Sequence, residues 1–236
     1  MVECTGLATN GTNMSSVYQT YEATTPQGHT WRLEMLNDEH AESPRDSQEN
    51  LGTMIYGHRR YTLGDERINE GSFQEYLEAK NLSFDKVVSL PLYLYDHSGL
   101  AMSTTDFGDP WDSGCVGAIF VSHDQIKQDY GNLDQSTLDM VEGVLRAEVE
   151  EMHEYLSGNS FGMRLTQFSG DGKQIEDPEE VYGFLGTDPR TNGMIDNIPS
   201  EVLEFLRPVL DQDLGRLPSQ EPSTEASAPA RAPRPR

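Results

Sequence analysis

The feature that most constrains the fold is one stripe of apolar residues in the second half of the chain. Its members follow one another at spacings of 3, 4, 4, 3 and 4 residues, and they are Leu138, Val141, Leu145, Val149, Met152 and Leu156. This spacing predicts one long α-helix with a single apolar face. Ser136 is the predicted N-cap, with Asp139 three residues later as in a capping box, and Gly158 is the stop signal. Because such a face must be covered by another layer, the remaining segments have to supply it.

Several shorter segments show the alternating or continuous apolar patterns of β-strands. The predicted strands cover residues 30–36, 87–95, 100–104, 115–121, 161–168 and 181–185, and a further short apolar run covers 51–57. Pro91 inside the second strand predicts an edge position or a bulge. Shorter helices are predicted after Ser72, after Ser122 or His123, and over 201–206. We therefore expect an α+β fold, with a mixed or antiparallel sheet and the long amphipathic helix packed on one face.

The two ends of the chain differ in composition from this body. Residues 1–27 are polar and are expected to be a disordered leader, in which Met14 is an alternative start. Residues 217–236 are mostly Pro, Ala, Ser and Arg and are expected to be a disordered tail. The expectation is one globular domain over 28–210. The sequence shows neither a secretory signal nor an apolar run of roughly 18 residues, so a cytoplasmic location without membrane contact is expected.

The charge of the chain narrows the classes of partner. It carries 40 acidic and 17 basic residues, for a formal net charge of −23. Direct binding of duplex nucleic acid is not expected, because such binding depends on Lys and Arg that neutralise phosphates. Two interpretations of the acidity remain open. It is a halophilic-like adaptation that keeps the protein soluble in a high-salt cytoplasm, or it imitates the phosphates of DNA.

Familiar catalytic and metal-binding signatures are missing. The sequence has no glycine-rich dinucleotide motif, phosphate loop, nucleophile elbow, His-Glu-x-x-His or Cys-x-x-Cys. Cys4 and Cys115 are too few for a disulfide scaffold or a zinc site, and Cys115 is expected to be an inert thiol in the core. Glu150 and His153 have the spacing of two ligands on one helix, but no second copy of the motif exists. Neither a metal nor another cofactor is expected.

Two polar segments that follow apolar runs are the candidate site. The residues expected to bind a partner are His58, Arg59, Arg60, Tyr61, Asp96, His97, Trp111 and Asp112. In one interpretation an arginine here clamps a carboxylate or phosphate. In the other, it pairs with a neighbouring acid such as Asp65 or Glu66. Strand ends gather at the edges of a sheet, so the two segments are expected to lie close together.

The second segment also allows a catalytic interpretation. His97, Asp96 and Ser113 are the candidate acid, base and nucleophile, with Cys115 as the alternative nucleophile. The alternative is structural, because Asp, Ser, Gly and Pro are common turn residues and Trp111 then serves as a lid over the core.

Three blocks of sequence resemble a family of uncharacterised phage, provirus and plasmid proteins. They comprise residues 50–65, with Asn-Leu-Gly-Thr-Met and Arg-Arg-Tyr, then 91–117, with Pro-Leu-Tyr-Leu-Tyr-Asp-His-Ser-Gly and Pro-Trp-Asp-Ser-Gly, and finally 182–194, with Gly-Phe-Leu-Gly and Asn-Gly-Met. The resemblance covers about residues 30–195. It implies an origin in a mobile genetic element and an accessory role in the cell that carries it. It implies no activity and no catalytic residue.

These observations lead to three hypotheses of function. The first is an accessory binding protein that engages a host or viral macromolecule, a defence system included, with a protein as the expected partner. The second is a small enzyme acting on a nucleotide or phosphate ester, with Arg59 or Arg60 on the phosphate and His97 as acid or base. The third is an acidic DNA mimic. The sequence does not specify an oligomeric state.

Overall fold

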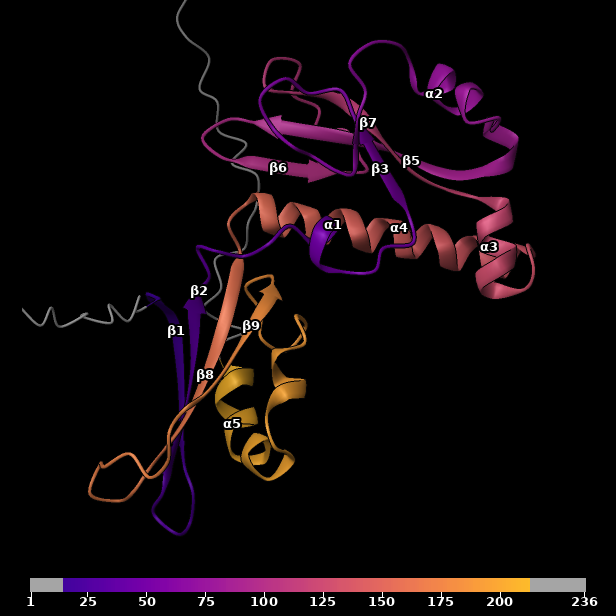
Figure 1. Ribbon diagram of the computed structural model, residues 1–236. Helices are drawn as coiled ribbons and strands as arrows, with labels where there is room; N and C mark the ends of the chain where they lie inside the picture. Colours follow the sequence, from indigo (N-terminus) through magenta and orange to yellow (C-terminus); the bar gives the residue numbers. More distant parts are fainter. Residues whose placement is uncertain (1–14, 213–236) are drawn as a thin grey trace, which may run out of the picture.

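The computed structural model describes residues 15–212, which form two β-sheets and the helices packed against them (Figure 1). The larger sheet has the order β4-β3-β7-β5-β6, and its strands are β3 (Thr53–Tyr56), β4 (Glu66–Arg67), β5 (Val87–Asp96), β6 (Leu100–Ser103) and β7 (Ser113–Ser122). The smaller sheet has the order β1-β2-β8-β9, and its strands are β1 (Val17–Thr24), β2 (Thr30–Asn37), β8 (Ser160–Phe168) and β9 (Glu179–Leu185). The α+β class is confirmed.

The helices and 3₁₀ turns alternate with these strands along the chain. They are α1 (Pro44–Ser47), α2 (Phe73–Ala79), η1 (Phe84–Lys86), α3 (His123–Tyr130), α4 (Gln135–Leu156), η2 (Met194–Asn197) and α5 (Ser200–Gln212). No helix within residues 15–212 combines the length and apolar character needed to cross a membrane.

The chain builds two sheets where the sequence predicted one. The smaller sheet is assembled from both ends of the described chain, since Trp31 of β2 lies opposite Gln167 of β8. The larger sheet is formed by the residues between these strands, and α4 runs beneath it (Figure 1). Apolar periodicity identifies a strand but not its neighbours, so it does not show how strands are divided between sheets.

Helix α4 packs the predicted stripe against the larger sheet. Val141, Leu145, Val149 and Met152 are buried in one cluster with sheet residues such as Ile119. The predicted N-cap was wrong by two residues. The carboxylate of Asp134 accepts the N–H of Thr137 at 2.9 Å, so the helix begins at Gln135. The hydroxyl of Ser136 donates to Asp134 at 2.8 Å instead of capping the helix.

A second core lies between the smaller sheet and α5. It includes Leu33 and Met35, which lie two residues apart in the predicted strand 30–36, together with Leu206 of α5. The predicted disordered leader was wrong for its second half, because Val17–Thr24 form β1. Tyr21 is the only residue of β1 that is buried, so the alternation is too weak to recognise in the sequence. Residues 1–14 and the predicted disordered tail, 217–236, lie outside the described residues.

Pro91 has the environment predicted for it, although β5 is not an edge strand. The sheet order places β5 between β7 and β6. However, β6 pairs only with Tyr93–Asp96, so Pro91 has a strand neighbour on the β7 side alone. The register also shifts between Leu92 and Tyr93, directly after the proline. Proline is tolerated where a strand has a neighbour on one side alone or beside such an irregularity.

Candidate functional site

The topology of the larger sheet brings the two predicted polar segments to one edge. Strand β7 is antiparallel to both β3 and β5, with Tyr56 opposite Gly117 and Tyr95 opposite Ser113. The C-terminal ends of β3 and β5 therefore both lie beside the N-terminal end of β7. The segment after β3, the β5–β6 turn and the loop before β7 meet there, although Asp96 follows Tyr61 by 35 positions in the sequence.

Side chains from these segments contact one another directly. The Arg60 guanidinium forms an ion pair with the Asp96 carboxylate, and the Tyr61 hydroxyl donates to the same carboxylate at 3.3 Å. The rings of His58 and Tyr61 are stacked with 4.9 Å between their centroids. An arginine of this segment therefore pairs with an acid, as one of the two interpretations had it, but the acid is Asp96. The examples named for that role pair elsewhere, Asp65 with Arg45 and Glu66 with Lys80.

A second pair joins the β5–β6 turn to the loop before β7. Nδ1 of His97 lies 2.9 Å from Oδ2 of Asp112. The backbone reinforces this contact, because the N–H of Asp96 donates to the carbonyl of Asp112 at 2.8 Å. Both side chains are accessible to solvent, with 63% of His97 and 37% of Asp112 exposed.

The candidate catalytic set is not linked into a relay. The Asp96 carboxylate contacts Arg60 and Tyr61, whereas His97 pairs with Asp112. The Ser113 hydroxyl donates to the backbone carbonyl of Asp109 at 2.6 Å. Within residues 15–212, no hydrogen bond joins Ser113 to His97, so the structure offers an oriented histidine without an activated hydroxyl.

Cys115 is exposed, contrary to prediction, and Trp111 is exposed, as a residue that binds a partner has to be. Cys115 is not a core thiol, because it lies in the first half of β7, whereas burial begins at Ala118. Trp111 is not a lid, since 91% of its surface is accessible. The Asp109 carboxylate accepts the N–H groups of Trp111 and Asp112 at 2.8 and 3.1 Å, which fixes the backbone that carries the indole. These bonds also hold the pKa of Asp109 below its usual value.

Further aromatic rings lie beside this loop. The rings of Tyr95 and Phe107 are 5.7 Å apart, and Tyr95 is 6.2 Å from His97. We use the name loop surface for the set Arg59, Arg60, Tyr95, Asp96, His97, Phe107, Trp111 and Asp112. Within residues 15–212, Arg59 is exposed and forms no ion pair. The loop surface thus combines exposed aromatic rings with charged groups of both signs.

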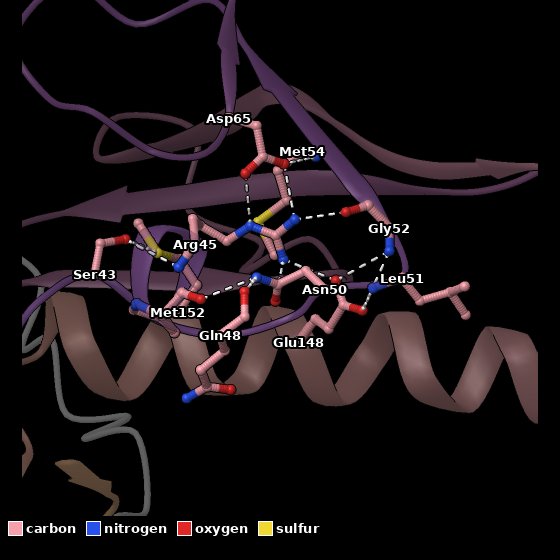
Figure 2. A network of polar contacts seen from close by, with 11 residues as sticks. Ser43, Arg45, Gln48, Asn50, Leu51, Gly52, Met54, Asp65, Glu148 and Met152 are labelled. Carbon is pink, nitrogen blue, oxygen red and sulfur yellow. Dashed lines mark hydrogen bonds and ion pairs between the residues drawn. The ribbon is translucent and has the colours of Figure 1, made fainter.

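A buried charged cluster that the sequence did not reveal lies between α1, α4 and the larger sheet (Figure 2). Only 3% of the Arg45 side chain is exposed. Its guanidinium makes a bidentate pair with Asp65 at 3.0 and 2.7 Å and contacts Glu148 at 2.7 Å. The remaining N–H groups donate to Asn50 and to the carbonyl of Gly52. Burial alone would lower the pKa of Arg45, but the hydrogen bonds with the two carboxylates raise it above its ordinary value.

The two carboxylates of this cluster also hold the backbone. Glu148 accepts the N–H of Leu51 at 2.7 Å, and Asp65 accepts the N–H of Met54 at 2.6 Å. Every buried side-chain nitrogen and oxygen in the described residues has a partner. The cluster is therefore internally satisfied, which is the condition for a structural network. Glu148 stands close to Glu150, Glu151 and Glu154 in the sequence, but its position three residues after Leu145 places it beside the buried stripe.

A groove of about 480 Å³ lies between α4 and the segment after β9. Glu150, Glu151, Glu154 and Asp188 are among its lining residues. Burial, and secondarily the charge of Glu148, raise the pKa of Glu151. Asp188 is already paired with Arg190, whose hydrogen bond lowers the pKa of that carboxyl.

The two candidate metal ligands on α4, Glu150 and His153, lie close to a third potential ligand, Glu154. Potential ligand atoms of Glu150, His153 and Glu154 all lie within 4.8 Å of one another. However, Nδ1 of His153 accepts the N–H of Met102 at 3.3 Å, so the neutral ring carries its proton on Nε2. A ligating histidine has the reverse arrangement, with one nitrogen on the metal and the other donating. The ring is therefore set up to hold β6 against α4.

The chain matches no family model, no curated protein and no solved structure. Its function therefore has to be inferred from the geometry of the loop surface and the contrast with the buried cluster.

Proposed function

We propose that this chain is an accessory binding protein of a mobile genetic element and engages a protein partner in the host cytoplasm through the loop surface. The observation that carries the proposal is Trp111, a residue that is 91% exposed while the N–H groups of Trp111 and Asp112 fix the backbone by donating to the Asp109 carboxylate. Tryptophan and arginine dominate the binding energy of protein interfaces, because they bury large areas and make directional contacts. Here both types lie on one edge of a sheet.

A rigid support reduces the cost of binding at this surface. The loop that carries Trp111 is joined to the β5–β6 turn by the bond from Asp96 N–H to the Asp112 carbonyl. The ring of Tyr61 lies against Arg60, with 5.0 Å between the guanidinium carbon and the ring centroid. Side chains that are already positioned lose less conformational entropy when a partner docks.

The charged groups of the loop surface supply specificity. Exposed ion pairs such as Arg60–Asp96 contribute little to folding, since water screens them. The same groups become important when a partner excludes water from them. Arg59 offers a further positive charge for an acidic group of the partner.

A small enzyme is the second candidate, and one observation favours it. The carboxylate of Asp112 orients Nδ1 of His97 at 2.9 Å, as in a general acid–base pair. The Ser113 hydroxyl, however, is bonded to the Asp109 carbonyl, so this candidate lacks its proposed nucleophile. A DNA mimic would instead bind nucleic-acid-binding proteins through its carboxylates and would be insensitive to loss of Trp111.

The test is affinity capture from lysates of cells that harbour the element, using the full chain and two matched variants. Trp111→Ala removes the exposed indole, and Tyr130→Ala removes an exposed ring at the end of α3. We expect one protein to be retained by the wild type and by Tyr130→Ala, with or without nuclease, and lost with Trp111→Ala. Equal capture by all three proteins would refute the proposal, and capture abolished by nuclease would indicate an indirect, nucleic-acid-mediated contact.

A further inference from the structure

The smaller sheet ends in a strand whose outer side is open. Within residues 15–212, β9 has a strand neighbour on one side only, which is β8 (Figure 1). The first five residues of β9, Glu179–Gly183, are all exposed. An edge of this kind presents a row of backbone N–H and C=O groups, which is a template for one further strand.

The hairpin between β8 and β9 fixes which backbone groups point outward. The N–H of Ile175 donates to the carbonyl of Gln167 at 2.9 Å, so the odd-numbered residues of β8 direct their backbone groups toward β9. By the register of the two strands, Val181 bonds inward, whereas Glu180 and Tyr182 direct their N–H and C=O groups away from the sheet. The outer edge of β9 therefore offers two donors and two acceptors to another backbone.

The edge of the larger sheet is closed by side chains, in contrast to β9. Strand β6 also ends its sheet, but α4 packs along it. The N–H of Met102 donates to Nδ1 of His153 at 3.3 Å, and the hydroxyl of Ser157 donates to the carbonyl of Leu100 at 3.0 Å. Residues 15–212 supply no such cover along the first five residues of β9, which is why these residues are exposed.

The side chains of this edge define the kind of segment that fits it. Val181 and Tyr182 are 38% and 44% exposed, and as neighbours in a strand they lie on opposite faces of the sheet. Residues 174–189 contain no lysine or arginine. Glu180 is paired with Arg164 of β8. Three other exposed acids of this stretch form no ion pair within residues 15–212, namely Glu176, Asp177 and Glu179.

We propose that the outer edge of β9 takes up an extended segment of a partner protein as a fifth strand, with basic side chains on these three acids and apolar side chains on Val181 and Tyr182. In such strand addition, main-chain hydrogen bonds supply affinity and alternate side chains supply specificity. A second copy of this chain is disfavoured, because it would bring the same acids and a net charge of −23. The inference goes beyond the proposed function, since the loop surface belongs to the other sheet.

The test is an NMR titration of the isotope-labelled full chain with a peptide of this chemistry, acetyl-Val-Thr-Val-Lys-Lys-Arg-amide, in about 0.15 M salt. When the peptide runs antiparallel to β9, as β8 does, its apolar half lies beside Val181 and Tyr182. We expect the amide resonances of Glu180 and Tyr182 to shift most. Their exchange with deuterium should slow at saturation, because both N–H groups become bonded.

Two analogues of the peptide separate backbone pairing from attraction between charges. One carries N-methyl groups on the backbone of its second and fourth residues, and the other carries them on its third and fifth. Only one edge of the peptide faces β9, so we expect one analogue to bind about ten-fold more weakly than the parent and the other to bind equally well. Attraction between charges alone would leave both analogues equal to the parent, and that result would overturn the proposal.

Two triple variants of the protein separate this edge from the acidity of the whole chain. The first neutralises the three acids through Glu176→Gln, Asp177→Asn and Glu179→Gln. The second makes the same change in charge at exposed positions of α3 and α4 through Asp124→Asn, Asp129→Asn and Asp139→Asn. We expect roughly ten-fold weaker binding in the first variant and less than a two-fold change in the second. Equal losses in the two variants would overturn the proposal.

The remaining outcomes identify other occupants of the edge. No binding of the parent peptide at millimolar concentration would refute a basic segment as the ligand. Protection of the Glu180 and Tyr182 amides without peptide, rising with protein concentration, would assign the edge to a second copy. Trp111→Ala should leave the titration unchanged, so failure of the loop surface in partner capture and failure of this edge are distinguishable. Loss of peptide binding in Trp111→Ala would place the peptide on the loop surface and contradict the proposal.

Discussion

Two arginines of this protein illustrate opposite uses of the same side chain. Arg45 is 3% exposed, is held by two carboxylates, and donates to backbone and amide oxygens as well. Arg60 is 67% exposed and pairs with one carboxylate, that of Asp96, which is itself 31% exposed. The first arginine joins α1, α4 and the larger sheet, whereas the second lies on the surface beside Tyr61 and Asp96.

The difference shows that the contribution of an arginine–carboxylate contact to folding depends on its burial. A buried charge is tolerated only when every polar group around it has a partner, and removing one partner leaves the others unpaired. An exposed pair exchanges readily with water, so the folded state gains little from it. The Arg45 cluster is therefore assigned to folding and the loop surface to binding, and the following predictions test that division.

The largest effect is expected at Arg45. Arg45→Ala leaves the carboxylates of Asp65 and Glu148 without their cation, and Glu148 is 9% exposed. Removal of one member of a buried ion pair costs about 3–5 kcal/mol. Urea denaturation of the variant should show this loss, and Arg67→Ala, an exposed change on β4, is the control. A loss under about 1 kcal/mol is typical of exposed ion pairs and would contradict a structural role for Arg45.

A comparable loss of stability is expected when an apolar side chain of the adjoining core is shortened. Leu145 is fully buried on α4, and Leu145→Ala should lower the free energy of unfolding by about 2–5 kcal/mol. Glu142 lies on the outer side of the same helix, where it pairs with Arg146 at 2.6 Å, and Glu142→Ala should cost about 0.5 kcal/mol. Similar losses at both positions would mean that another face of α4 contacts the sheet.

A smaller, pH-dependent effect is expected at Glu151. Its pKa is raised in the folded protein from an ordinary value of 4.5, chiefly by burial. The native state therefore binds the proton more tightly, and stability declines as pH rises from about 4.5 through the folded pKa. Glu151→Gln should consequently stabilise the protein at pH 7 and have less effect at pH 4. Melting curves at both pH values test this, with the exposed neighbour Glu150→Gln as control.

The smallest effect on stability is expected at the loop surface. Arg60→Ala should change the free energy of unfolding by less than about 1 kcal/mol, because its pair with Asp96 is exposed. Partner capture should nevertheless weaken. A double-mutant cycle with Asp96→Ala measures the coupling between the two side chains, and a coupling as large as that of the Arg45 pairs would assign both to folding.

The sequence predicted the local structure of this protein better than its assembly. The cap at Ser72 and the strand around Leu33 follow from contacts within a few residues, and both are present. The division of strands between two sheets depends on pairings such as Trp31 with Gln167, which no local pattern encodes. Strand β1 was missed because a single buried tyrosine gives no recognisable period.

The same distinction applies to the polar residues. Strand ends meet at sheet edges, so the proximity of Arg60 to Asp96 and of His97 to Asp112 could be anticipated. Which groups pair could not, because that depends on the turns between them. Arg45 was overlooked since it stands in a polar loop, and only its tertiary contacts reveal it as buried. For Trp111 the sequence left two interpretations open, a residue that binds a partner or a lid over the core, and the structure shows that the indole is exposed.

The most direct test of the central claim uses one variant with two changes, His97→Ala and Trp111→Ala, in the full chain. Its urea midpoint and its partner capture are measured on the same preparation, beside the wild type. The account predicts a midpoint within error of the wild type and complete loss of capture. A midpoint lowered as far as that of Arg45→Ala, or capture that survives both changes, would contradict the assignment of the loop surface to binding.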